Sequence, residues 1–191
     1  MKKIVILMMV FMISFITGCD DVKDAAEVKI DVTQEADPQE VTITAQEFIE
    51  DIDLTETDGY DDQYDDLLKD IEIRKMEYKI PSGSGDTGVY GKLTFYATDF
   101  EGATDVATSH QITDGLRLNA GEKILEWTEV PLIAEGRNWF EDTLLSKKKV
   151  RVWGSLKVYN ANDEVCTSCS FTATIETRYD IRIKANPLDL I

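Results

Sequence analysis

The chain has few basic residues, a single histidine and little cysteine. Its 191 residues include 37 Asp and Glu but only 20 Lys and Arg, for a formal net charge of −17. Affinity for nucleic-acid backbones comes from Lys and Arg, so this balance excludes nucleic acid as an expected partner. The acidity is typical of a soluble, self-repelling surface. Binding of divalent cations, or a salt-rich habitat, is the alternative interpretation.

The scarcity of histidine also narrows the chemistry. His110 is the sole histidine, so a Ser-His-Asp catalytic set would have to use it, and its neighbour Ser109 lies in no Gly-x-Ser-x-Gly elbow. We therefore expect no catalytic residues, no cofactor and no enzyme activity. An enzyme acting through paired Asp and Glu carboxylates remains an alternative, because such pairing depends on a spatial separation that a sequence does not reveal.

Only one long hydrophobic run is present, and it lies at the start of the chain. Lys2 and Lys3 precede an almost wholly apolar run from Ile4 to Ile16. A helix that spans a bilayer needs about 20 apolar residues, so this run is too short. A charged start, a short apolar run and a small-residue cleavage site are typical of a secretory signal peptide.

The junction after this run reads Ile16-Thr17-Gly18-Cys19. It resembles the lipobox of bacterial lipoproteins. The resemblance implies a thioether-linked diacylglyceryl group on Cys19 and cleavage after Gly18. It also implies that the new amino terminus is acylated, with palmitate as the expected acyl group. It places the protein in the bacterial cell envelope, lipid-anchored and extracytoplasmic, with the choice of inner or outer membrane open. The alternative is a secreted protein with an incidental cysteine at its cleavage site.

Composition divides the chain into three parts. Residues 1–18 are the predicted signal peptide. Residues 19–40 are acidic and poor in large apolar side chains, which predicts a flexible tether. Residues 41–191 are long enough to bury a core without disulfides and are predicted to form a single β-rich domain.

Apolar and polar residues alternate with a period of two through most of this domain. The alternation predicts strands after Val41, over Ile71–Ala97 and from Ile124 to Val130, with further strands over Val150–Tyr159 and Phe171–Ala185. The segment Ile71–Ala97 is predicted to be a hairpin that turns at Pro81–Gly85. The alternation slips by one residue near Arg74, which predicts a β-bulge.

One short helix is expected among these strands. Asn138 and Glu141 resemble a capping pair, which predicts a helix over Trp139–Leu145. The predicted fold is all-β, an antiparallel β-sandwich of immunoglobulin-like type with one short helix. A β-barrel has the same period-two pattern and is the alternative.

Cys166 and Cys169 are the only paired cysteines. In an exported chain such a pair is expected to form a structural disulfide. Two residues three apart on a regular strand point to opposite faces, so a bridge requires a turn or bulge between them. Free thiols and a metal site are the alternatives.

The segment 51–70 is dense in aspartate, and hard cations such as calcium prefer oxygen ligands. It therefore contains weak candidates for an irregular calcium site. A solvated acidic loop is the alternative. The candidate ligands are Asp58, Asp61, Asp62 and Asp65.

Two aromatic residues lie on one face of the strand Val150–Tyr159. Trp153 and Tyr159 share that face with Arg151 and Lys157. An exposed aromatic strip of this kind could bind sugar or a partner protein. The alternative is that a helix or loop covers Trp153.

These observations favour a lipid-anchored envelope lipoprotein with a non-catalytic binding or structural β-domain. Its expected partners are the membrane, through the lipid anchor, and an envelope protein or glycan. A carbohydrate- or calcium-binding module is the alternative class.

Overall fold

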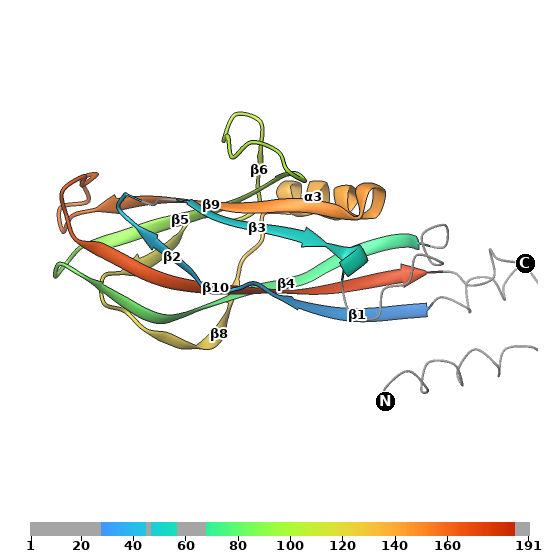
Figure 1. Ribbon diagram of the computed structural model, residues 1–191, viewed down its shortest axis with the longest axis horizontal. Helices are drawn as coiled ribbons and strands as arrows, with labels where there is room; N and C mark the ends of the chain where they lie inside the picture. The colour runs from blue at the N-terminus through green and yellow to red at the C-terminus, as the bar shows by residue number, and fades with distance from the viewer. Residues whose placement is uncertain (1–27, 45–46, 57–67, 186–191) are drawn as a thin grey trace, which may run out of the picture.

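Two antiparallel β-sheets pack face to face in this protein (Figure 1). The computed structural model describes residues 28–44, 47–56 and 68–185. Sheet A has the strand order β1 (Val28–Glu35), β10 (Phe171–Ala185), β4 (Leu68–Gly85) and β8 (Ile124–Val130), and β2 (Gln39–Thr42) also pairs with β10. Sheet B has the order β3 (Glu47–Asp53), β9 (Lys149–Tyr159), β5 (Tyr90–Asp99) and β6 (His110–Gln111), and β7 (Leu116–Asn119) also pairs with β5.

The main strands alternate between the two sheets along the chain. β3, β5 and β9 belong to sheet B, whereas β4, β8 and β10 belong to sheet A. This strand order is that of a jelly roll. The predicted antiparallel β-sandwich with one short helix is confirmed. Its connections differ from the immunoglobulin arrangement, in which several chain-adjacent strands pair within one sheet.

The predicted hairpin over Ile71–Ala97 is wrong for the same reason. β4 and β5 are consecutive strands, but β4 pairs with β10 and β8, whereas β5 pairs with β9, β6 and β7. A hairpin and a crossover between sheets have the same alternating pattern, and only the pairing partners separate them.

The core lies between the sheets and follows the alternation of β9 and β10. Phe48 and Phe95 are fully buried and meet edge to face, with 5.6 Å between ring centroids. Burying one such apolar side chain stabilises the fold by about 1.5–3 kcal/mol. Thr177 takes the inward position between Ile175 and Tyr179, so β10 runs unbroken where the apolar pattern lapses.

The predicted bulge near Arg74 is confirmed. Lys75 pairs with Asp180 and Ile73 with Ile181, so Arg74 is the extra residue of β4. The extra residue shifts the alternation by one position, which keeps both Ile73 and Met76 in the core.

The turn predicted at Pro81–Gly85 lies slightly later in the chain. Ser82–Gly85 continue β4 and pair with β10, and the chain turns over Asp86, Thr87 and Gly88, with a φ of +82° at Gly88. The residues Gly83–Gly88 have the spacing Gly-x-Gly-x-x-Gly that is typical of dinucleotide-binding folds. They lead into a strand here, so the helix that this function needs is missing.

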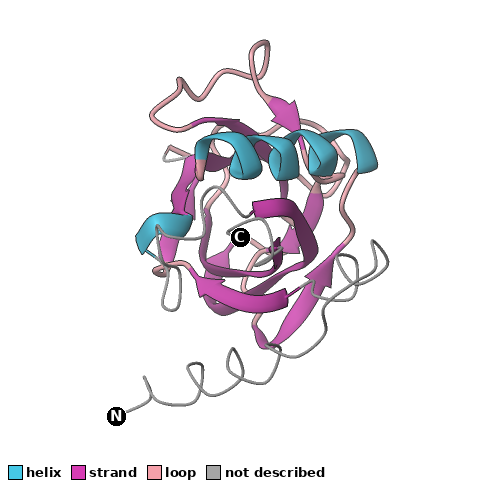
Figure 2. Ribbon diagram, turned by 90° about the vertical axis from the view of Figure 1, so that its right-hand side faces the viewer, coloured by secondary structure: helices cyan, strands magenta, loops and turns pink. Residues whose placement is uncertain are grey.

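The helix α3 (Ala134–Lys147) begins earlier than predicted. Ile133 precedes it without a side-chain cap, so Asn138 lies inside the helix and is not its cap. β8 pairs with β4 only between Met76 and Ile80. α3 packs against the adjoining part of β4, and Figure 2 shows this helix lying across one side of the sandwich. The Ile73 amide donates to Glu141 Oε1 over 2.8 Å, which satisfies a backbone group at this open edge.

The predicted tether over 19–40 is wrong for its second half, because Val28–Glu35 form β1. This strand pairs with β10 along its whole length. Arg182 holds Asp31 through two hydrogen bonds of 2.8 and 3.0 Å, and Thr33 donates to Asp180 over 2.9 Å. β10 thus supplies an arginine that pairs with the acidic side chain of β1. The acidic composition of residues 19–40 did not suggest such a partner. Residues 19–27 lie outside the described part.

The two ends of the sandwich differ. Val28 and Ala185 pair at one end, which we call the near end. The turns after β4, β7 and β9 lie at the opposite end, which we call the far end (Figure 1). No helix within the described ranges is long and apolar enough to cross a bilayer.

Candidate functional site

The two residues of the predicted aromatic strip on β9 have different surroundings in the structure. Trp153 is only 2% exposed, and its indole N–H donates to Ser109 Oγ over 3.0 Å. Its ring also stacks on Tyr96, with 4.7 Å between centroids. The connection between β5 and β6, which carries Ser109, therefore covers Trp153. The alternative that a loop covers this residue is confirmed, and Trp153 is not available to a ligand.

Tyr159 remains accessible at the far end of sheet B. It is half-buried and stacks on Tyr90 of β5, with 5.2 Å between ring centroids and 12° between ring planes. The guanidinium carbon of Arg117 lies 3.6 Å from the Tyr90 ring centroid. β9 and β7 flank β5, so Tyr159 and Arg117 approach Tyr90 from opposite sides.

Three cations lie side by side next to this stack. Lys92 pairs in register with Lys157 on one side and with Arg117 on the other, and all three are exposed. None of them forms an ion pair with a carboxylate of the described residues. We call this surface the tyrosine–cation patch, formed by Tyr90, Lys92, Arg117, Lys157 and Tyr159.

This lack of partners contrasts with the outer face of sheet A. There Lys79 pairs with Glu176 at 2.5 Å, and Arg178 pairs with Glu77 at the same distance. Like charges directly opposite one another on neighbouring strands destabilise a sheet. Local departures from good pairing are expected at binding sites. In a chain with 37 acidic residues, a row of three unpaired cations marks this patch as the candidate site.

The far-end loops hold Tyr90 in place. Its hydroxyl donates to Asp163 Oδ1 over 3.0 Å. Burial, and then the hydrogen bond to this carboxylate, raise the pKa of Tyr90 above its ordinary value, so the ring stays neutral. The patch therefore combines neutral aromatic faces with fixed positive charge.

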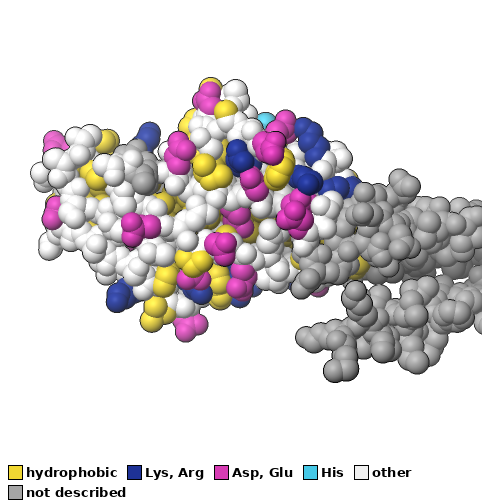
Figure 3. Space-filling model, viewed as in Figure 1, with side chains coloured by type: hydrophobic (Ala, Val, Ile, Leu, Met, Phe, Trp, Pro, Cys, Tyr) yellow, Lys and Arg dark blue, Asp and Glu magenta, His cyan; other side chains and the backbone are white. Residues whose placement is uncertain are grey.

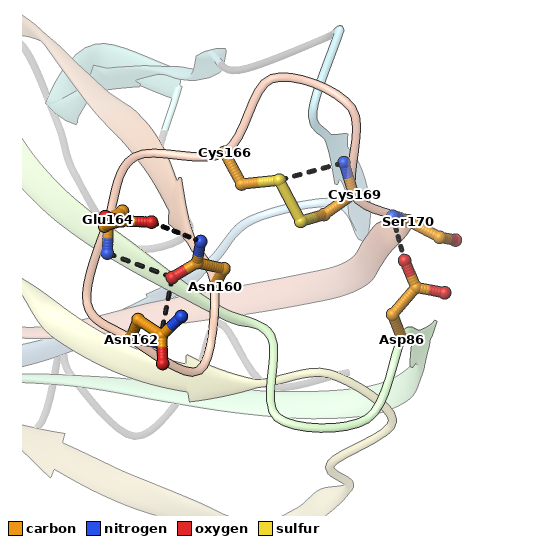
Figure 4. Close-up of a disulfide and its surroundings, with 7 residues drawn as sticks. All are labelled: Asp86, Asn160, Asn162, Glu164, Cys166, Cys169 and Ser170. Atoms are coloured by element: carbon orange, nitrogen blue, oxygen red, sulfur yellow. Dashed lines mark hydrogen bonds between the residues drawn. A yellow bond between two sulfur atoms is a disulfide. The ribbon is translucent and has the colours of Figure 1, made fainter.

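The predicted disulfide between Cys166 and Cys169 is present in the loop that carries Asp163 (Figure 4). The two Cα atoms are 5.8 Å apart, and the cysteines lie in the turn that such a short bridge requires. The Ser170 amide donates to Asp86 over 2.8 Å, which ties this loop to the turn after β4. The two cysteines are therefore bonded to each other in this structure and are neither free thiols nor metal ligands.

The predicted calcium ligands Asp58, Asp61, Asp62 and Asp65 lie outside the described residues. An acidic groove of about 450 Å³ does open between β1 and β3, lined in part by Asp31, Asp51 and Asp53. Arg182, Arg151 and Lys149 respectively neutralise these carboxylates. Acidic and basic side chains are interspersed on the face that Figure 3 presents. The described ranges contain no group of three metal-binding side chains.

Three groups of a kind used in catalysis, His110, Ser109 and Glu50, are engaged in packing or hydrogen bonds. The His110 ring stacks on Trp139, with 4.3 Å between centroids. Ser109 accepts the Trp153 hydrogen bond described above. Burial raises the pKa of Glu50 to about 7, but this carboxyl is only 8% exposed and points to Thr177 in the core.

Three residues of the patch, namely Tyr90, Lys92 and Arg117, were not predicted from the sequence. Tyr90 and Lys92 alternate with Gly91 and Leu93, which places them on the outward face of a predicted strand. That pattern does not say which strands flank β5, so it could not bring Lys157 and Arg117 beside Lys92.

No protein-family model and no curated protein matches this chain in sequence. Among solved structures, it is similar to that of Mud crab tombus-like virus, with 10% identity, a TM-score of 0.36, and coverage of 86% of this chain and 84% of the other. A Macrobrachium rosenbergii nodavirus particle gives 9% identity, a TM-score of 0.31, and coverage of 83% and 95%. Tobacco necrosis virus gives 10% identity, a TM-score of 0.31, and coverage of 85% and 99%. Likenesses this weak imply no function.

Proposed function

We propose that this protein is a lipid-anchored lipoprotein of the bacterial cell envelope. In this proposal its jelly-roll domain binds an envelope partner through the tyrosine–cation patch and performs no catalysis. Cys19 carries the anchor, as the lipobox resemblance implies.

The observation that carries the proposal is the placement of the patch relative to the chain's entry into the domain. Val28 begins β1 at the near end, whereas Tyr90 and Tyr159 lie at the far end. The nine residue steps from Cys19 to Val28 span about 30 Å at most when fully extended. β10, with 15 residues, is about 50 Å long. A lipid on Cys19 would therefore keep the near end within about 30 Å of the bilayer, while the patch lies at the opposite end of the domain.

The anchor is tested by the intact mass of the protein extracted from membranes of its native host. The expected mass shows cleavage before Cys19 and added acyl chains, and Cys19→Ala is expected to abolish both the lipid and the membrane attachment. An unmodified, cleaved protein in the soluble fraction would contradict the anchor.

The binding role is tested by co-sedimentation of the lipoprotein, solubilised in neutral detergent, with envelope fractions that lack it. The double variant Lys92→Glu/Lys157→Glu is expected to lose the association, because it reverses the charge of the patch. Lys29→Glu/Lys123→Glu is the matched control, since both lysines are exposed and lie outside the patch. Equal association of all three proteins would rule out the patch as the binding surface.

A further inference from the structure

We propose that the tyrosine–cation patch binds an acidic glycan, meaning a sugar chain that bears carboxylate groups. This inference rests on the proposed function and names the ligand class of the same site. The carboxylates lie against Lys157, Lys92 and Arg117, and a sugar ring packs on Tyr159.

Arg117 is held ready for a carboxylate. Its Nε donates to Asn119 Oδ1 over 3.3 Å, and its guanidinium carbon lies over the Tyr90 ring, 3.6 Å from the ring centroid. Its two terminal nitrogens have no hydrogen-bond partner among the described residues. A planar guanidinium with free terminal N–H groups can donate two parallel hydrogen bonds to one carboxylate. Because stacking already restricts this side chain, less conformational entropy is lost when it binds.

The row of cations matches an extended polymer better than a single ion. Neighbouring strands lie about 4.8 Å apart, so the backbones that carry the three cations span about 10 Å. The stem of Lys92 lies across Gly115, where an added Cβ would come within 2.5 Å of Lys92 Cε. The Lys92 stem therefore leans toward β7 on the side of Gly115 and Thr94, while the Arg117 guanidinium lies over Tyr90. A chain with an anionic group on successive rings can follow the row.

The surroundings of the row favour a sugar over other polyanions. Thr94 and Ser155 pair on the same outer face, one position further along β5 and β9, and both are half-buried. Their hydroxyls can donate to and accept from sugar hydroxyls, while the tyrosine rings offer flat apolar surface. The net charge of −17 opposes the dense charge of a nucleic acid. Because charges are screened within about 8 Å at physiological salt, the local row of cations can attract a short anionic sugar despite the net negative charge of the chain.

The test titrates the full lipoprotein, in neutral detergent, with a short oligogalacturonate and with a neutral galactose oligosaccharide of the same length. We expect the acidic sugar to bind at least about tenfold more tightly, and salt to weaken that binding. Lys92→Gln/Lys157→Gln and Arg117→Gln should each weaken it by about tenfold or more. Tyr159→Ala should weaken it as well, with the salt dependence retained. Lys29→Gln/Lys123→Gln should bind as the unaltered protein does.

Each other outcome overturns the proposal in a distinguishable way. If poly-glutamate binds as tightly as the oligogalacturonate, the site recognises carboxylate groups in general and is not selective for sugar. If the control variant weakens binding as much as the patch variant, the effect is one of overall charge. If no acidic sugar binds while Lys92→Glu/Lys157→Glu still abolishes envelope association, the ligand class is wrong and the proposed function stands. If that association is also insensitive to the patch, both fail.

Discussion

Thr177 of β10 donates a hydrogen bond across the sandwich to Glu50 of β3, with 2.9 Å between Oγ1 and Oε2. The two residues belong to different sheets, and both are buried. The second carboxyl oxygen, Glu50 Oε1, has no hydrogen-bond partner among the described residues, and neither has the nearby Tyr179 hydroxyl. Leaving a buried polar atom unpaired costs about 1–3 kcal/mol. The contact thus couples the protonation of one carboxyl to the packing of the sheets.

Glu50 should make the stability of the fold depend on pH. Burial raises the folded-state pKa from 4.5 to about 7, against the opposing effect of the Thr177 hydrogen bond. Between these values the folded state holds a proton that the unfolded state has lost, so the free energy of unfolding falls as pH rises from 4.5 to 7. The total fall in the free energy of unfolding over this pH range is about 3 kcal/mol. Glu50→Gln should remove this slope and be more stable than the unaltered protein above pH 7.

Urea unfolding across this pH range measures the effect. Glu126→Gln is the control, because Glu126 is exposed on β8 and should leave the slope unchanged. An unaltered slope in Glu50→Gln would show that another group is responsible.

Thr177→Val should destabilise the protein by about 1–3 kcal/mol, because it removes the Thr177 hydrogen bond to the Glu50 carboxyl while preserving side-chain shape. The loss should be larger above pH 7, where the carboxyl is charged. Thr177→Ser keeps the hydroxyl and should lose less. Urea unfolding of both variants at pH 4.5 and above pH 7 measures these losses of stability. Equal losses for Thr177→Val and Thr177→Ser would contradict a role for the hydroxyl.

Glu141→Ala should loosen α3 from the edge of β4. The variant leaves the Ile73 amide without its acceptor, at a cost of about 1–2 kcal/mol. Hydrogen exchange of that amide should accelerate, whereas Glu141→Gln keeps an acceptor and should protect it. Exchange that is equally slow in Glu141→Ala would mean that the helix covers the edge without this contact.

Replacing both Cys166 and Cys169 by serine should cost about 2 kcal/mol at most, since the loop that they close is short. The fold should survive, because the core lies between the sheets and away from this loop. Thermal unfolding of the double variant, compared with the unaltered protein under non-reducing conditions, measures the loss. A complete loss of folding would show that the loop is required for the jelly roll to form.

The sequence by itself determined the local features of this protein. Alternation with a period of two is a property of one strand, so β9 and β10 were predictable, as was the slip that places a bulge at Arg74. The disulfide was predicted because a pair of cysteines in an exported chain is expected to bridge, and the spacing of two intervening residues predicted the turn that holds it. The anchor at Cys19 is local as well, and it stays a prediction because it lies outside the described residues.

Only the tertiary structure decided what depends on pairing between distant segments. Strand alternation has the same form whichever strand lies alongside, so it could not separate a β4–β5 hairpin from the jelly-roll order. The acidic composition of residues 19–40 predicted a tether. Part of this segment instead forms β1, where Arg182 of β10 pairs with Asp31. Trp153 is covered by a loop from another part of the chain. The row Lys157–Lys92–Arg117 exists only because three strands, far apart in sequence, align their outward faces in one sheet.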